Sequence, residues 1–216
     1  MYRFSLLILI VLSMGCNRSM TQNAMDSDKG WISLFDGQTL NGWKVGTNAS
    51  SFSIEDGCIK VNGPKAHLYY VGDVENHNFK NFEFKTKVKT MSNSNSGIYI
   101  HTKYQETSWP KIGYEVQVNN THGDWKKTGS LYDVIEVAER YVGDDEWFTE
   151  YIKVEGKRII IKINDTVVVD YTEPDNPKRE EGDRQFRVLT SGTFAFQAHD
   201  PKSIVYFKDV MVRPLP

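Results

Sequence analysis

Cysteine is scarce in this chain of 216 residues, which contains only two. Cys16 ends an apolar N-terminal segment, so Cys58 is the one thiol of the remaining chain. A single thiol cannot form an internal disulfide, and no closely spaced cysteine pair is present to bind a metal ion. We therefore expect Cys58, within SFSIEDGCIKV, to be a small buried apolar residue and not a catalytic thiol.

An excess of charge of either sign is also missing. The 26 Lys and Arg residues and 28 Asp and Glu residues give a formal net charge of −2. This balance provides no basic footprint for a nucleic acid. The sequence also has no glycine-rich phosphate-binding loop and no Gly-x-Ser-x-Gly nucleophile motif. Nucleic-acid binding and these two enzyme classes are therefore not indicated.

Long apolar runs are missing except at the N-terminus, where the chain reads MYRFSLLILIVLSMGC. One Arg precedes the apolar residues 6–12, and small residues lead to Cys16. The run is too short for a membrane-spanning helix and has the organisation of a secretory signal.

The Gly15-Cys16 junction resembles the lipobox of bacterial lipoproteins, in which the cysteine is acylated and becomes the first mature residue. Ser13 departs from the Leu usual at that position, so a simple secreted or periplasmic protein is the alternative. We expect residues 1–16 to be a lipoprotein signal peptide and residues 17–29 a flexible polar tether. The protein would then be anchored through Cys16 in the cell envelope of a Gram-negative bacterium, at the outer membrane or in the periplasm.

Helical periodicity is scarce after residue 30, and a period of two replaces it. NFEFKTKVKT places Phe82, Phe84 and Val88 on one face and charged residues on the other. The segments SGIYIHTKY, GYEVQVNN, LYDVIEV, RIIIKIN, GTFAFQAHD and SIVYFKDVMVRPL repeat this alternation, and EPDNPKREEGDR is expected to be a solvated loop. Many short strands at this spacing predict an all-β fold of antiparallel strands, a sandwich or a barrel, in one domain over residues 30–216.

Three predicted strands carry an unusual polar set opposite their apolar residues. They are SGIYIHTKY, GYEVQVNN and GTFAFQAHD. If each apolar set faces the core, the other sets lie on the outer face of a sheet, where neighbouring strands would bring them together. The residues assigned to this face are Tyr99, His101, Lys103, Glu115, Gln117, Asn119, Gln197 and His199.

Such a face suits carbohydrate chemistry. Amides donate and accept hydrogen bonds as sugar hydroxyls do, and aromatic rings pack against the C–H face of a pyranose. Histidine, or a partly desolvated Glu115, can act as general base or acid. Lys103 would place positive charge near a developing oxyanion. Trp109 borders this face or covers the sandwich edge, and ordinary solvated surface is the alternative for each residue taken alone.

The phrase GWISLFDGQTLNGWKV resembles the opening of the DUF1080 family, the 3-keto-disaccharide hydrolase or 3-keto-glucoside 1,2-lyase/hydratase domain. The resemblance continues through NSGIYIHT, GYEVQV, GSLYDVIEV, YIKVEGKRIIIKINDTVVVDY and GTFAFQAHDPKSIVYFKDVMVRPL, and so covers residues 30–216. It implies a concanavalin A-like jelly-roll sandwich with a concave carbohydrate face.

The resemblance also implies glycoside cleavage by elimination. A partner oxidoreductase first oxidises the C3 hydroxyl of the sugar, and the ketone acidifies the C2 proton. Loss of that proton expels the C1 substituent, and hydration of the 2-hydroxy-glucal completes a net hydrolysis. The site needs a base, a donor or cation at the enolate oxygen, and an acid at the glycosidic oxygen. A divalent metal ion would polarise the ketone, and His101, Glu115 and His199 are suitable ligand types.

Within the resemblance, Glu115 and Gln117 fall in the YEVQ phrase, and Gln197 and His199 fall in the Q-x-H phrase. His101 stands where other members carry Arg after the NSGI phrase. We expect His199 or His101 to be the base, and Glu115 to be its orienter or the acid. Hydroxyls would be bound by Gln117 and Gln197, and Tyr99 and Lys103 would border the developing charge.

Two other functions fit the same strands. A conventional glycosidase of the glucanase type needs two carboxylates about 5–10 Å apart. Glu115 is the one candidate on the predicted face, because Asp133 and Glu136 alternate to opposite sides of LYDVIEV. Asp124 or Asp200 would have to reach in from a loop. A non-catalytic carbohydrate-binding lipoprotein would use the same aromatic rings and amides without a base.

Overall fold

The structure is a computed structural model that describes residues 29–182 and 185–216. Within it, Ile32–Pro216 forms one compact unit. The predicted signal peptide, including Cys16, and the tether up to residue 28 lie outside the described residues. No helix in the described part is both long and apolar enough to cross a membrane.

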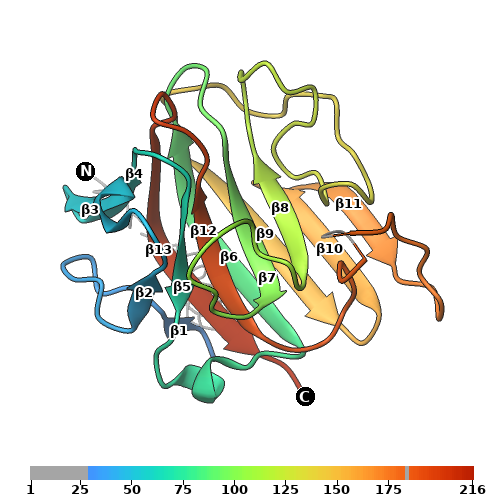
Figure 1. The fold of residues 1–216 in the computed structure, drawn as a ribbon. Helices are drawn as coiled ribbons and strands as arrows, with labels where there is room; N and C mark the ends of the chain where they lie inside the picture. Colours follow the sequence, from blue (N-terminus) through green and yellow to red (C-terminus); the bar gives the residue numbers. More distant parts are fainter. Residues whose placement is uncertain (1–28, 183–184) are drawn as a thin grey trace, which may run out of the picture. The chain divides into compact units, whose positions relative to one another are not determined.

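Two antiparallel sheets make up the unit (Figure 1). The larger sheet consists of β1 (Ile32–Ser33), β3 (Phe52–Glu55), β4 (Cys58–Val61), β6 (Phe82–Thr90), β9 (Phe148–Glu155), β10 (Arg158–Ile163), β11 (Thr166–Thr172) and β13 (Val205–Pro214). Its order is β11-β10-β9-β6-β13-β4-β3, and β1 pairs with β13.

The smaller sheet consists of β2 (Trp43–Val45), β5 (Ala66–Tyr70), β7 (Ser96–Thr102), β8 (Tyr114–Val118) and β12 (Thr193–Ala198), in the order β2-β5-β12-β7-β8. Short 3-10 helices, η1 (Ala49–Ser51) and η2 (Val74–His77), occur in the connections. The predicted antiparallel all-β sandwich is therefore confirmed.

The core lies between the two sheets. Phe84 of the larger sheet contacts Phe194 of the smaller one, with ring centroids 4.7 Å apart. Phe196 stacks on Phe207 at 4.2 Å. Burial of these rings stabilises the sandwich, since each removes a large apolar area from water. Cys58 is buried as predicted, and burial raises the pKa of its thiol.

Four of the five strands of the smaller sheet are buried on both faces, because every residue of β5, β7, β8 and β12 is buried, whereas the edge strand β2 is partly exposed. Connections between strands cover the face that was expected to be open. Trp109 comes from the segment between β7 and β8, Tyr132 from that between β8 and β9, and Arg187 from that between β11 and β12. The polar residues of this face therefore form the floor of a pocket bordered by these loops.

The segment LYDVIEV, predicted as a strand, forms turns with isolated bridges. Asp133 has a φ angle of 61°, which interrupts an extended chain. Lys126 hydrogen-bonds to Asp133 and lies 3.2 Å from Glu136 Oε1. Asp133 and Glu136, which were expected on opposite sides of a strand, therefore both contact Lys126.

Candidate active site over the smaller sheet

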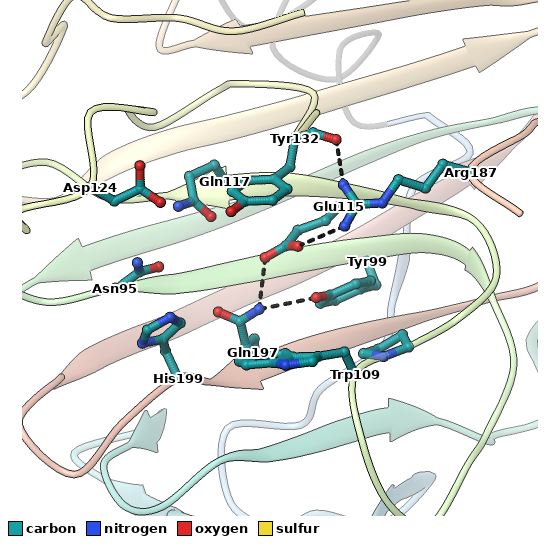
Figure 2. Close-up of a pocket in the computed structure, with 11 residues that line it drawn as sticks. Asn95, Tyr99, Trp109, Glu115, Gln117, Asp124, Tyr132, Arg187, Gln197 and His199 are labelled. Carbon is teal, nitrogen blue, oxygen red and sulfur yellow. Dashed lines mark hydrogen bonds and ion pairs between the residues drawn. The ribbon is translucent and has the colours of Figure 1, made fainter. Parts of the chain in front are cut away.

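A cavity of about 320 Å³ lies over β7, β8 and β12, within the size range of small-molecule sites (Figure 2). Side chains of these strands form its floor, and loop residues form its walls. It is lined by Asn95, Tyr99, Trp109, Pro110, Glu115, Gln117, Asp124, Tyr132, Arg187, Gln197 and His199.

Six of the nine residues that the sequence places on this face or at its border line this cavity, and Asn119, His101 and Lys103 do not. The six are Tyr99, Trp109, Glu115, Gln117, Gln197 and His199. Lys103 follows the end of β7 at Thr102, is exposed, and does not line the cavity. Period-two alternation therefore located most of the floor, because the alternation is a property of the strand itself.

His101 does not lie on this face, so its predicted meeting with Glu115 and His199 is wrong. Its φ angle is 54°, and the pairing of β7 with β12 shifts register nearby. The ring packs edge-to-face on Phe82 at 5.6 Å, and Nε2 lies 2.9 Å from the carbonyl oxygen of Lys80. Burial lowers the pKa of His101 to about 4. A bulge adds one residue to a strand and reverses the alternation beyond it.

The metal ligand set considered from the sequence is consequently not assembled. Within the described residues, no three His, Cys, Asp or Glu side chains are grouped so as to hold a metal ion. Glu115 and His199 line the cavity while His101 is directed toward Phe82 and Lys80.

Glu115 lies at the centre of the floor and is 5% exposed. Its Oε1 accepts a hydrogen bond of 2.7 Å from Gln197 Nε2, and its Oε2 lies 3.9 Å from an Arg187 guanidinium nitrogen. Burial raises the pKa of Glu115, and the charge of Arg187 opposes that rise. A carboxyl group in this setting keeps its proton to higher pH than an exposed glutamate does, which suits it to act as an acid.

His199 forms a pair with Asp200, whose Oδ2 lies 2.9 Å from His199 Nδ1. Burial opposes ionisation of Asp200, but hydrogen bonds from His199, Ser203 and the Lys202 backbone lower its pKa to about 2. The charged carboxylate accepts a hydrogen bond from Nδ1–H, and in the neutral ring this tautomer has its lone pair on Nε2. Asp200, rather than Glu115, therefore orients this imidazole.

Arg187, Tyr132 and Asn95 were not predicted as site residues. Arg187 donates a 2.5 Å hydrogen bond to the carbonyl oxygen of Tyr132 and thereby joins two loops beside Glu115 (Figure 2). All three residues lie in connections, where no periodic pattern indicates which side chain turns inward. Only the tertiary arrangement reveals them.

The fold and the site define a class: an antiparallel β-sandwich with a hydroxyl- and amide-lined cavity over one sheet. The chain belongs to the 3-keto-α-glucoside-1,2-lyase-like domain family, which matches residues 30–213. The family resemblance seen in the sequence is thus confirmed.

The chain is similar to a 3-keto-disaccharide hydrolase of Bacteroides thetaiotaomicron, with 34% identity over 178 residues, 69% of this chain and 61% of that protein. It therefore spans about three fifths of that relative's length. A Parabacteroides distasonis protein described as a candidate glycosyl hydrolase superposes with a TM-score of 0.71 at 23% identity, over 89% of this chain and 97% of that one.

The VIP36 exoplasmic/lumenal domain, in a form bound to Ca²⁺ and Man3GlcNAc, superposes with a TM-score of 0.52 at 10% identity. The match covers 87% of this chain and 89% of that domain. At these identities the structural likenesses show the fold alone, and that fold is the predicted concanavalin A-like jelly-roll sandwich.

Proposed function

We propose that the protein cleaves 3-keto-glycosides by removing the C2 proton of the sugar and expelling its C1 substituent. One observation carries the proposal: a single cavity holds an oriented imidazole, a buried carboxyl group and a guanidinium group. The family and the name of the Bacteroides relative support the substrate class.

In this proposal His199 is the base. A ketone at C3 acidifies the proton on C2, and the free Nε2 lone pair removes it. Asp200, already hydrogen-bonded to Nδ1, stabilises the imidazolium that forms. His101, the other predicted base, lies outside the cavity and has no role in this scheme.

Arg187 stabilises the negative charge that develops on the C3 oxygen, a role expected of Lys103 from the sequence. Protonated Glu115 donates to the departing glycosidic oxygen, and Gln197 and Arg187 stabilise the carboxylate left behind. Hydration of the 2-hydroxy-glucal then restores the site: Glu115 takes a proton from the attacking water, the hydroxyl adds to C1, and His199 returns a proton to C2.

The proposed substrate carries a ketone, so an oxidoreductase must first remove two hydrogens from the C3 hydroxyl and its carbon. We also propose that the two proteins act in the cell envelope, with this one held by a lipid on Cys16. The signal-like residues 1–16 support this placement.

A conventional glycosidase is a second candidate, because Asp124 lines the same cavity as Glu115. Two carboxyl groups across one cavity are the requirement of that mechanism. It would act on an unoxidised glucoside and would not exchange the C2 proton.

Incubation with methyl 3-keto-glucoside in deuterated buffer, followed by NMR, tests the proposal. Deuterium should enter C2 and methanol should be released, and His199→Gln should slow both by about 10²–10⁴-fold. The exposed His77, on η2, provides the control His77→Gln, which should behave like the wild type.

Hydrolysis of methyl glucoside without C2 exchange would select the glycosidase instead. Binding of sugars without turnover of either compound would select a carbohydrate-binding module, and the elimination mechanism would then be discarded.

A further inference from the structure

Three amide oxygens in the cavity have no hydrogen-bond partner among the described residues. They are Asn95 Oδ1, Gln117 Oε1 and Gln197 Oε1. Their side chains belong to residues only 2%, 1% and 2% exposed, yet all three line the cavity. Buried carbonyl oxygens in native proteins almost always accept a hydrogen bond from protein or water, so three without a protein partner in one cavity are placed to accept from a bound molecule that donates.

The Gln197 amide nitrogen is hydrogen-bonded to two neighbours. Its Nε2 donates to Glu115 Oε1 at 2.7 Å and to the Tyr99 hydroxyl at 3.1 Å. Both amide hydrogens are thereby used, and in this arrangement Gln197 Oε1 has no partner among the described residues. The atom left unpaired is therefore the oxygen.

Asn95 is held in a comparable way. Its backbone N–H donates to Ser203 Oγ at 2.9 Å, and its side-chain nitrogen lies 3.3 Å from His122 Nδ1. Ser203 also donates to Asp200, the partner of His199. The Asn95 backbone N–H is thus linked through Ser203 to the carboxylate that pairs with His199, while the Asn95 side-chain oxygen has no partner among the described residues.

Acceptors and cation occupy different sides of the cavity. In Figure 2 the amides of Asn95, Gln117 and Gln197 turn toward the space beside His199, whereas Arg187 approaches from the other side of Glu115. A ligand that fills the cavity therefore has hydrogen-bond acceptors on one side and the positively charged guanidinium group of Arg187 on the other.

We infer that these three amide oxygens accept hydrogen bonds from three hydroxyls of one neutral sugar ring, whose carbonyl oxygen is directed to Arg187. The inference rests on the proposed function for the identity of the ring. A 3-keto-hexopyranosyl unit carries hydroxyls at C2, C4 and C6, and its C3 oxygen can only accept. An anionic sugar, such as one with a carboxylate at C6, would place charge against an unpaired acceptor and is excluded.

Calorimetry with 1,5-anhydro-3-keto-glucitol, which has no glycosidic bond, tests this inference separately from catalysis. Asn95→Leu and Gln117→Met remove one acceptor each with little change in volume. Each should weaken binding about tenfold, the effect of one lost hydrogen bond. Gln38→Met, at an exposed glutamine outside the cavity, is the matched control and should bind like the wild type. Thermal unfolding of each variant checks that it is folded.

The 4-deoxy and 6-deoxy analogues complete the test. Each should bind the wild type about tenfold more weakly, and the loss should disappear in the variant that lacks its partner oxygen. Replacing the C6 hydroxymethyl group by a carboxylate should abolish binding. Unchanged affinity in both variants, or for both deoxy analogues, would overturn the inference.

The inference and the proposed function can fail independently. Amide-dependent binding without turnover of methyl 3-keto-glucoside would leave the hydroxyl site standing and remove the elimination mechanism. Turnover that is unaffected by Asn95→Leu and Gln117→Met would support the elimination mechanism and remove the hydroxyl site.

Discussion

Glu150 is a carboxyl group inside the sandwich, away from the cavity. It lies on β9, is 0% exposed, and neither of its oxygens has a hydrogen-bond partner among the described residues. Its cross-strand neighbours are Thr86 and Ile163. Burial alone raises the pKa of Glu150 well above its usual value. An unpaired buried carboxylate is costly, so the folded protein holds this group protonated.

Replacing Glu150 with Met should therefore stabilise the protein, and more so as the pH rises. Below the unfolded-state pKa, near 4.5, the carboxyl group is neutral in both the folded and the unfolded state. The substitution then removes only an unpaired buried polar group, which should raise the free energy of unfolding by about 1–3 kcal/mol. Above that pH the unfolded chain releases its proton first, and the wild type loses up to about 1.4 kcal/mol per pH unit until the folded pKa is reached.

Urea unfolding at pH 4, 6 and 8 measures this difference. Glu106→Met, at an exposed position, is the control and should show no such growth with pH. If the gain in the free energy of unfolding for Glu150→Met is the same at pH 4 and pH 8, Glu150 is not held protonated in the folded protein.

At the scale of elements, the segment after β11 is anchored although its charge suggested a solvated loop. Glu173 is buried and accepts the Leu189 backbone N–H at 3.1 Å on Oε1 and 3.0 Å on Oε2. The Tyr114 hydroxyl also hydrogen-bonds to Glu173. Arg179 donates to Tyr114 at 2.7 Å and to the backbone oxygen of Arg187 at 2.7 Å. This network positions the guanidinium group that faces Glu115.

Tyr114→Phe should disrupt this network more than Tyr171→Phe. The Tyr114 hydroxyl both donates to Glu173 and accepts from Arg179, whereas Tyr171 only accepts from Arg179, at 2.9 Å. The first variant leaves a buried carboxyl group short of a donor, so it should lose about 1–3 kcal/mol of stability, against about 1 kcal/mol or less for the second.

Urea unfolding and kcat on a 3-keto-glucoside measure the two effects. Because Arg187 is positioned through Arg179, Tyr114→Phe should also lower kcat, while Tyr171→Phe should leave it nearly unchanged. Equal losses in the two variants would show that the hydroxyl of Tyr114 has no special part in the network.

The predicted elements also show where sequence periodicity is informative. Phe82 and Phe84 on β6, and Glu115 and Gln117 on β8, lie on the faces that alternation assigned to them. His101 breaks the rule because a positive φ angle turns the chain within β7. No local sequence pattern predicts such a bulge, because its position depends on the partner strand and the surrounding loops.

At the scale of the whole molecule, the two sheets differ in what covers them. β9 alternates buried and half-exposed residues, as expected of a sheet with one face toward water. β8 carries the same alternation of apolar and polar residues but is buried throughout. Apart from Glu150 and Tyr151, the alternation in β9 matches that in β8. Only the loops that carry Trp109, Tyr132 and Arg187 turn one polar face into a site.

The proposed lipid anchor would attach the protein to the membrane through Cys16, a residue that does not belong to the folded unit. If Cys16 is acylated, Cys16→Ser should move the full-length protein from the membrane fraction to the soluble fraction and abolish labelling with a fatty-acid probe. Thermal stability and turnover should not change, because Cys16 lies outside the compact unit Ile32–Pro216.

Cys58→Ser is the matched control: this thiol is buried inside the unit, so the variant should stay labelled and membrane-bound, with at most a small loss of stability. A wild-type protein that takes up no fatty acid and fractionates as soluble would contradict the anchor and favour the secreted or periplasmic alternative.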